Sequence, residues 1–336
     1  MTSPTCSPRI SARPAAAALA LLLAAVFPSG LTRAQDAVAS VTDFTIAAIT
    51  YDDGWQTPLR NPTSLFFDSN SGELFAADAG NHRVLIYDRH LNARYSFEHF
   101  VREPRSGRTV KGEPRDLVVT TAGEIVLADN FAHYLEVLDF RGKSLEKVHL
   151  NRLYGDTSLV IKPQCLTIDA ADNIYVATVG DITTVMVLSD RFELKRTIGQ
   201  KGGAPSEFNT PLGMHLWRDR LYVTDLYANP AVKVFDTTGT YLFGFAAHDI
   251  ARADMSFPSG LTVLPDSSGR ASVWIVDGLR QVIKVFDHSG EFVELVGGFG
   301  INPGEFRYPA DIAAAGDSAF FVLEKTGGRI QRFEIK

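Results

Sequence analysis

Five polar residues of this chain could form a ligand-binding site. Each lies one, two or four positions after a proline that opens a short alternating run of apolar residues: Arg115, Asp116, Gln164, His215 and Asp311. Carboxylate oxygens favour calcium, and histidine favours zinc or iron. Brought together, these side chains could hold a divalent metal ion, calcium or zinc. In the structural alternative, each aspartate binds backbone amides at the start of a strand and His215 fills an inner layer of the fold.

Known catalytic motifs are absent from the sequence. It contains no Gly-x-Ser-x-Gly elbow, no His-Glu-x-x-His helix, no Walker loop and no Cys-x-x-Cys pair. We therefore assign no catalytic residue. Whether the protein is an enzyme stays open at this point, and a non-catalytic protein is the favoured interpretation.

The prolines belong to six repeats, so the elements that position the polar residues recur along the chain. The repeats start about 50 residues apart, at Pro62, Pro114, Pro163, Pro211, Pro258 and Pro309. A second strand-like run follows each proline run and mostly ends in an acidic residue. A third run then alternates apolar and polar residues, and a fourth follows in most repeats. Four short strands in each of six units predict an all-β fold, a six-bladed β-propeller with four-stranded antiparallel blades.

The two ends of the chain complement each other. The sixth repeat stops at Lys336, directly after its third strand, whereas residues 41–49 form a strand-like segment before the first complete repeat. We expect this N-terminal strand to supply the missing outer strand and to close the ring, which leaves no unpaired sheet edge. Residues 35–336 are then a single propeller domain.

The first repeat carries a recognisable motif, Ala77-Asp78-Ala79-Gly80-Asn81-His82-Arg83-Val84. It resembles the NHL family, whose usual core reads Ala-Asp-x-x-Asn-His-Arg-Ile, and this resemblance implies a propeller. The third and sixth repeats depart from the motif, with Thr178 and Glu324 in place of the aspartate. The motif residues have mainly structural uses. Gly80 would provide the positive φ of a tight turn, Asp78 and Asn81 would bind backbone amides, and Arg83 could pair with an acidic residue, as could Arg329 at the same position of the sixth repeat.

The first 34 residues read as a signal peptide. Two arginines precede the apolar run 15–27, and Thr32-Arg33-Ala34 offers a cleavage site. The run is too short to span a bilayer, so we expect an exported protein, periplasmic or extracellular, with no transmembrane segment in the mature chain. Cleavage would leave 30 basic and 39 acidic residues, a formal charge of −9 that disfavours nucleic acid. Cys165 would be the single remaining cysteine, so no intrachain disulfide can form, and we expect a monomer.

Two functions fit these observations. The first is an exported, non-catalytic scaffold that binds a protein, peptide or glycan ligand at the channel face through its loops. The alternative is a metal-dependent lyase or hydrolase at the central channel mouth, with Asp116, Asp311 and His215 around the metal and Arg115 orienting an anionic substrate. The connectors 100–111 and 245–256 are longer than joining adjacent blades requires, and long loops often carry binding.

Overall fold

The computed structural model describes residues 44–103, 106–265 and 268–336. The chain divides into two compact units, Met1–Val38 and Ala39–Lys336, and every described residue belongs to the second. The predicted signal peptide, residues 1–34, lies outside the described residues, as do residues 41–43 of the predicted closing strand.

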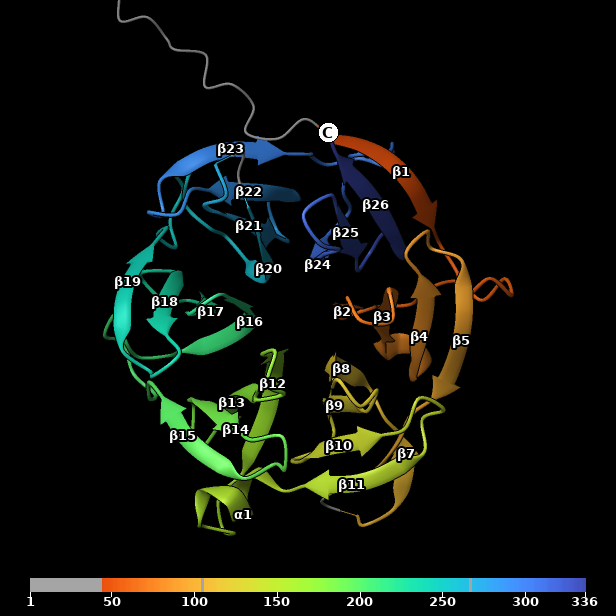
Figure 1. Ribbon diagram of the computed structural model, residues 1–336, viewed down its shortest axis with the longest axis vertical. Coiled ribbons are helices and arrows are strands. Elements are labelled where there is room, and N and C mark those ends of the chain that lie inside the picture. Colours follow the sequence, from red (N-terminus) through yellow and green to blue (C-terminus); the bar gives the residue numbers. More distant parts are fainter. Residues whose placement is uncertain (1–43, 104–105, 266–267) are drawn as a thin grey trace, which may run out of the picture. The chain divides into compact units, whose positions relative to one another are not determined.

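Six four-stranded antiparallel sheets form the blades of a β-propeller (Figure 1), which confirms the predicted fold. In blades 1 to 5 the strands follow the sequence from the inner strand, at the central channel, to the outer strand. The inner strands contact one another around the ring. Side chains on both faces of a blade are therefore covered by its two neighbours.

The strand bounds are as follows. Blade 1 consists of β2 (Ser64–Asp68), β3 (Glu73–Asp78), β4 (Arg83–Asp88) and β5 (Ala93–Glu98). Blade 2 consists of β8 (Pro114–Val119), β9 (Ile125–Asp129), β10 (Leu135–Leu138) and β11 (Ser144–Val148). Blade 3 consists of β12 (Ile161–Ile168), β13 (Ile174–Gly180), β14 (Val185–Leu188) and β15 (Leu194–Ile198). Blade 4 consists of β16 (Thr210–Trp217), β17 (Arg220–Leu226), β18 (Val232–Asp236) and β19 (Tyr241–Phe245). Blade 5 consists of β20 (Pro258–Pro265), β21 (Ala271–Asp277), β22 (Val282–Phe286) and β23 (Phe292–Val296). Blade 6 consists of β24 (Pro309–Ala314), β25 (Ala319–Glu324), β26 (Arg329–Ile335) and β1 (Phe44–Thr50).

Blade 6 closes the ring with strands from both ends of the second unit. The outer strand β1 pairs antiparallel with β26, from Phe44 opposite Ile335 to Thr50 opposite Ile330. The Phe44 ring packs edge-on against Phe333 at 5.5 Å and against Trp274 of blade 5 at 6.4 Å. The predicted closure by the N-terminal strand is confirmed. Its physical basis is backbone pairing together with the aromatic contacts of Phe44.

The connectors of the blades fall on two faces of the ring. Successive strands of a blade are antiparallel, so the chain changes face with each strand. The connector from an outer strand to the next inner strand therefore lies on the same face as the turn between the second and third strands. We call this the mouth face. It also carries the two-stranded hairpin β6 (Phe100–Arg102) and β7 (Thr109–Lys111), and the short helices η1 (Ala79–Asn81) and α1 (Leu150–Tyr154). None of the described helices is long and apolar enough to cross a membrane.

Acidic residues at the ends of the second strands fasten the mouth-face connectors. Asp78 accepts a hydrogen bond from the Arg60 amide and pairs with Arg83 at 2.8 Å. Glu324 accepts one from the Arg307 amide and pairs with Arg329 at 2.5 Å. The predicted pairing of both arginines is confirmed, and these acids serve as turn scaffolds.

The expected role of Gly80 was wrong. Positive φ occurs at His82, with φ of 59°, and Gly80 is not among the positive-φ glycines of the described residues. A Cβ at Gly80 would instead lie 2.5 Å from the Arg60 carbonyl oxygen. Glycine is therefore needed here for the close approach of two backbone segments. Asn81 donates hydrogen bonds to the Pro58 carbonyl and to the Asp78 carboxylate, whereas we had expected it to bind backbone amides.

Candidate functional site

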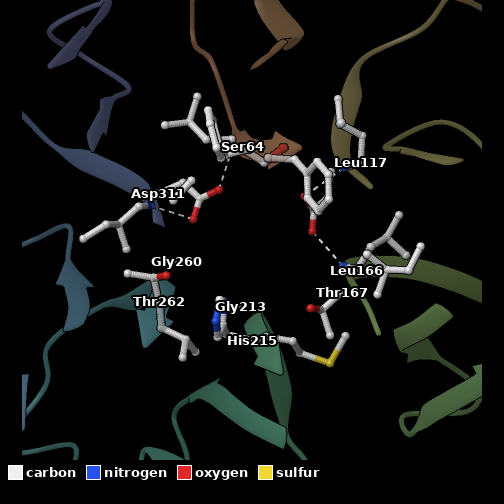
Figure 2. A pocket seen from close by; sticks show the side chains of 18 of the residues that line it. Ser64, Leu117, Leu166, Thr167, Gly213, His215, Gly260, Thr262 and Asp311 are labelled. Atoms are coloured by element: carbon white, nitrogen blue, oxygen red, sulfur yellow. Dashed lines mark hydrogen bonds between the residues drawn. The ribbon is translucent and has the colours of Figure 1, made fainter. Parts of the chain in front are cut away.

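A cavity of about 530 Å³ lies at the central channel, lined by the inner strands of all six blades (Figure 2). All five polar residues singled out in the sequence line it: Arg115, Asp116, Gln164, His215 and Asp311. The ring therefore brings together residues that are up to about 200 positions apart in the sequence.

Bulges at the start of the inner strands direct side chains into the mouth of this cavity. The pairing register shifts directly after the proline of an inner strand, for example between Pro114 and Asp116 and between Pro163 and Cys165. A bulge leaves one extra residue unpaired and re-aims it. Arg115 and Gln164 are these extra residues, which explains why polar side chains in the first position after the proline reach the channel.

Asp116 and Asp311 connect neighbouring inner strands. Asp116 accepts hydrogen bonds from its neighbour Leu117, at 2.8 Å, and from Leu166 of blade 3, at 2.7 Å. The Asp311 carboxylate accepts hydrogen bonds from the backbone amides of Ile312, at 2.8 Å, and of Leu65 in blade 1, at 2.7 Å. Each carboxylate thus holds two backbone amides across a blade boundary, which is the structural alternative raised by the sequence.

Gly260 makes room for the Asp311 carboxylate. A Cβ at this glycine would lie 1.8 Å from Asp311 Oδ1. Figure 2 shows Gly260 next to Asp311 at the channel wall. The glycine of blade 5 and the aspartate of blade 6, both two positions after the proline, are therefore complementary in shape.

Burial weakens the acidity of both carboxyl groups. It raises the pKa of Asp116 to about 6 despite the hydrogen bonds from Leu166 and Leu117, which lower it. Burial, followed by the negative charge of Asp116, raises the pKa of Asp311 well above its usual range. Burying a charge without a strong counter-ion is costly, so these groups favour the neutral form more than free carboxylates do.

His215 does not join the carboxylates. Burial lowers its pKa to about 4, so the imidazole is neutral near pH 7. Figure 2 shows it beside Gly213 of the same strand, across the channel from Asp311. Within residues 44–103, 106–265 and 268–336, no group of three or more His, Cys, Asp and Glu side chains is arranged to hold a metal ion. The proposed metal set of Asp116, Asp311 and His215 is thus not assembled.

Two basic side chains line the same cavity as the carboxyl groups of Asp116 and Asp311. Arg115 donates through Nε to the Gln164 carbonyl and through Nη1 to Asn130 Oδ1, both at 2.8 Å, and its Nη2 makes no hydrogen bond with the described residues. Lys325 also lines the cavity, and its ammonium group forms no ion pair or hydrogen bond with them. Burial and then the charge of Arg115 lower the pKa of Lys325, whereas the negative charge of Glu113 raises it. Arg115 Nη2 and the Lys325 ammonium group are therefore charged donors that an anionic group could use.

Sequence reasoning missed Lys325, although a signal was present. Lys325 directly follows the acidic residue that ends the second strand of blade 6. The residues in this position of blades 1 to 5 are Ala79, Asn130, Val179, Leu226 and Gly278, and none of them is charged. Comparing the repeats at this position, as was done after the prolines, would have identified it.

Cys165 takes the second position after the proline in blade 3 and is a free, buried cysteine. Burial raises the pKa of its thiol well above the usual range. A buried thiol with a raised pKa is a poor nucleophile. Cys165 is therefore a packing residue of the channel wall.

Comparison with known proteins supports the fold. No protein-family model and no curated protein matches the chain, so the NHL resemblance remains a prediction. Solved structures do match. Streptogramin B lyase is 14% identical, with 87% of this chain and 98% of that chain covered and a TM-score of 0.57. A gluconolactonase from Xanthomonas campestris is 14% identical, with 82% and 86% covered and a TM-score of 0.56. A luciferin-regenerating enzyme is 11% identical, with 86% and 95% covered and a TM-score of 0.60.

Proposed function

We propose that this chain is an exported, non-catalytic binding protein whose channel mouth takes an anionic group of its ligand. The carrying observation is the pair of basic side chains at the mouth, Arg115 with a free Nη2 and Lys325 with no partner among the described residues. Both side chains are half-buried, and an arriving carboxylate would accept charge-assisted hydrogen bonds from these free donors. Protein, peptide and glycan ligands can all supply such a group.

The distribution of exposed apolar side chains supports binding at the same face. Among the described residues, large exposed hydrophobic side chains gather on the mouth-face connectors: Tyr51, Trp55, Phe100, Phe131, Tyr154, Val160, Tyr227, Ile250, Leu279, Phe299 and Ile301. On the opposite face, the turns of the described residues offer Phe140. Exposed apolar surface next to charged groups is typical of an interaction site.

The anion site is tested by weak-binding measurements with N-acetylglycine and its uncharged amide. Using NMR titration, we expect the acid to bind more tightly than the amide and its affinity to fall as salt is added. Lys325→Gln should remove the preference. Lys143→Gln, on a turn of the opposite face, is the matched control. Equal binding of acid and amide to the wild-type protein would refute the anion site.

The second candidate function is catalytic. Several structural neighbours are named as lyases or lactonases, and Asp116, with its pKa near 6, could exchange a proton near neutral pH. A divalent metal would be needed for the lyase or hydrolase predicted from the sequence. Elemental analysis of the purified protein decides this point. A stoichiometric metal would favour the enzyme if a chelator removes both the metal and an activity.

Export is part of the proposal and rests on residues 1–34. Mass spectrometry of the protein recovered from the cell envelope or the medium should show a mature chain that starts at Gln35. A protein that keeps residues 1–34 and stays in the cytoplasm would contradict export.

A further inference from the structure

A second, apolar hollow adjoins the channel mouth. This groove has a volume of about 540 Å³ and lies between the connectors of blades 5 and 6. Its walls include Leu279, Phe299 and Ile301, which are exposed to 58%, 73% and 68%, and the polar residues Gln281, Glu305, Arg307 and Thr326. Three large apolar side chains grouped with that much exposure are typical of a binding surface.

The backbone holds these side chains in place. Phe299 forms a β-bridge with Phe306, which is completely buried, and the Phe306 amide donates to the Gly298 carbonyl at 2.7 Å. On the other wall, the amide of Gly278, next to Leu279, donates to the Phe257 carbonyl at 3.1 Å. The groove is thus a formed surface rather than a frayed loop, and a ligand can bind to it without ordering the chain first.

The groove is continuous with the anion site. Tyr308 lines both the groove and the channel cavity. Lys325 lines the cavity, and the next residue, Thr326, lines the groove. A ligand whose anionic end meets Arg115 and Lys325 can therefore extend past Tyr308 into an apolar environment.

Polar groups near the anion site select among amphipathic anions. Ser259 occupies the first position after the proline of blade 5, and its buried hydroxyl has no hydrogen-bond partner. The side-chain amide of Gln164, which is only 9% exposed as a residue, makes no hydrogen bond with the described residues either. A ligand with peptide groups beside its carboxylate would satisfy both, whereas an alkyl chain would leave them unpaired.

We propose that the mouth face binds the C-terminal end of a polypeptide, with the terminal carboxylate at Arg115 and Lys325 and an apolar side chain in the groove of Leu279, Phe299 and Ile301. This inference rests on the proposed anion site and adds the class of ligand. Such binding would combine recognition of the carboxylate charge with burial of an apolar side chain, and both would contribute to affinity and specificity.

Three fluorescein-labelled peptides test the proposal by fluorescence anisotropy: Ser-Gly-Ser-Gly-Leu-Phe with a free C-terminus, the same peptide with a C-terminal amide, and Ser-Gly-Ser-Gly-Ser-Ser with a free C-terminus. For the wild-type protein we expect the first to bind at least tenfold more tightly than either of the others. A tenfold gain corresponds to about two buried methylene groups, at roughly fourfold each.

Variants assign the two contributions to their sites. Leu279→Asn with Ile301→Ser should make the Leu-Phe and Ser-Ser peptides bind equally, while the free acid remains preferred over the amide. Lys325→Gln should abolish the acid preference and keep the apolar one. Phe140→Ser, which changes a 61% exposed phenylalanine on a turn of the opposite face that lines neither hollow, should change nothing. All changed groove residues are exposed, and a circular-dichroism melt confirms folding.

The contrary outcomes are distinct. If the Leu-Phe and Ser-Ser peptides bind wild-type protein equally, the groove proposal fails and the anion site survives. If the acid and the amide bind equally, the anion site and the proposed function fail. Decanoate is the test for a ligand without peptide groups. If its binding is weakened both by Lys325→Gln and by Leu279→Asn with Ile301→Ser, and none of the peptides binds, the assignment to a polypeptide end is overturned.

Discussion

Blades 4 and 5 bury an ion pair at the point where blade 2 buries two carboxyl groups and a histidine. In blade 4, Asp225 meets Lys233 at 2.6 Å, and in blade 5, Asp277 meets Lys284 at 3.2 Å. The register of the strands places Glu136 of blade 2 where the other two blades have lysine, opposite Leu127 and beside Asp129.

The third member of the blade 2 cluster comes from the preceding connector. His99 Nε2 lies 3.5 Å from Asp129 Oδ2 and 3.8 Å from Glu136 Oε2, and none of these three atoms has a hydrogen-bond partner. Burial lowers the pKa of His99 to about 4, so it is no cation near pH 7. Burial also raises the pKa of Asp129 to about 7. Lys147 of the outer strand reaches Glu136 Oε1 at 3.5 Å, so Asp129 is the carboxyl group of this cluster that favours its protonated form.

The largest effect is expected from removing a lysine of the paired blades. Lys284→Met leaves Asp277 buried without its ammonium partner, and breaking a buried pair in this way costs about 3–5 kcal/mol. Urea denaturation at pH 7 measures the loss. A cost below 1 kcal/mol would show that the backbone amides of Ser256 and Phe257, together with the Arg280 guanidinium 3.9 Å away, suffice for Asp277.

Asp129 should make blade 2 sensitive to pH in the opposite direction from an ordinary salt-bridged aspartate. Because its folded pKa lies above the unfolded value, the folded state holds the proton more tightly, and the contribution of Asp129 to the free energy of unfolding falls as the pH rises from about 4 to about 7. The loss is on the order of 4 kcal/mol. In Asp129→Asn this loss should be absent, so the variant gains relative to the wild type as the pH rises.

Asp225→Asn is the matched control for that experiment. It removes the partner of Lys233 and should destabilise the protein throughout the range from pH 5 to pH 8. If the stabilities of Asp129→Asn and Asp225→Asn change alike with pH, Asp129 does not carry a proton in the folded protein and blade 2 does not differ from blade 4 in this respect.

Gly112 permits the close approach in blade 2. A Cβ there would lie 2.4 Å from Asp129 Oδ2 and 2.6 Å from His99 Cδ2. Gly112→Ala should therefore displace one of these side chains and cost about 1–3 kcal/mol, as overpacking does. Thermal melts of this variant and of Gly203→Ala, whose added Cβ meets nothing within 4 Å, make the comparison.

The smallest effect is expected at Lys325. Unlike Lys284, Lys325 forms no ion pair or hydrogen bond with the described residues, so Lys325→Met keeps the aliphatic stem and removes a longer-range attraction to Glu113 and a repulsion from Arg115. We expect a change within about 0.5 kcal/mol at pH 7. A loss as large as that of Lys284→Met would mean that Lys325 has a structural role and would weaken the proposed anion site.

The repeats allowed more of the fold than of the site to be predicted. Each proline run and each acidic strand end is a local pattern, so blade number, strand order and closure by the N-terminal strand could be derived without coordinates. The five polar channel residues were also found, because they are exceptions at repeated positions. Their roles were harder to predict, since Asp116 and Asp311 bind amides of the next blade and His215 stands apart from them.

The sequence by itself determined the architecture, because strand periodicity and turn residues act over a few positions and recur six times. Only the tertiary structure decided which side chains meet. Lys325 and Arg115 are more than 200 residues apart and become neighbours when the ring closes. The groove of Leu279, Phe299 and Ile301 likewise joins connectors of different blades. Such contacts depend on bulges and on blade-to-blade packing, which are set by the whole ring rather than by any one repeat.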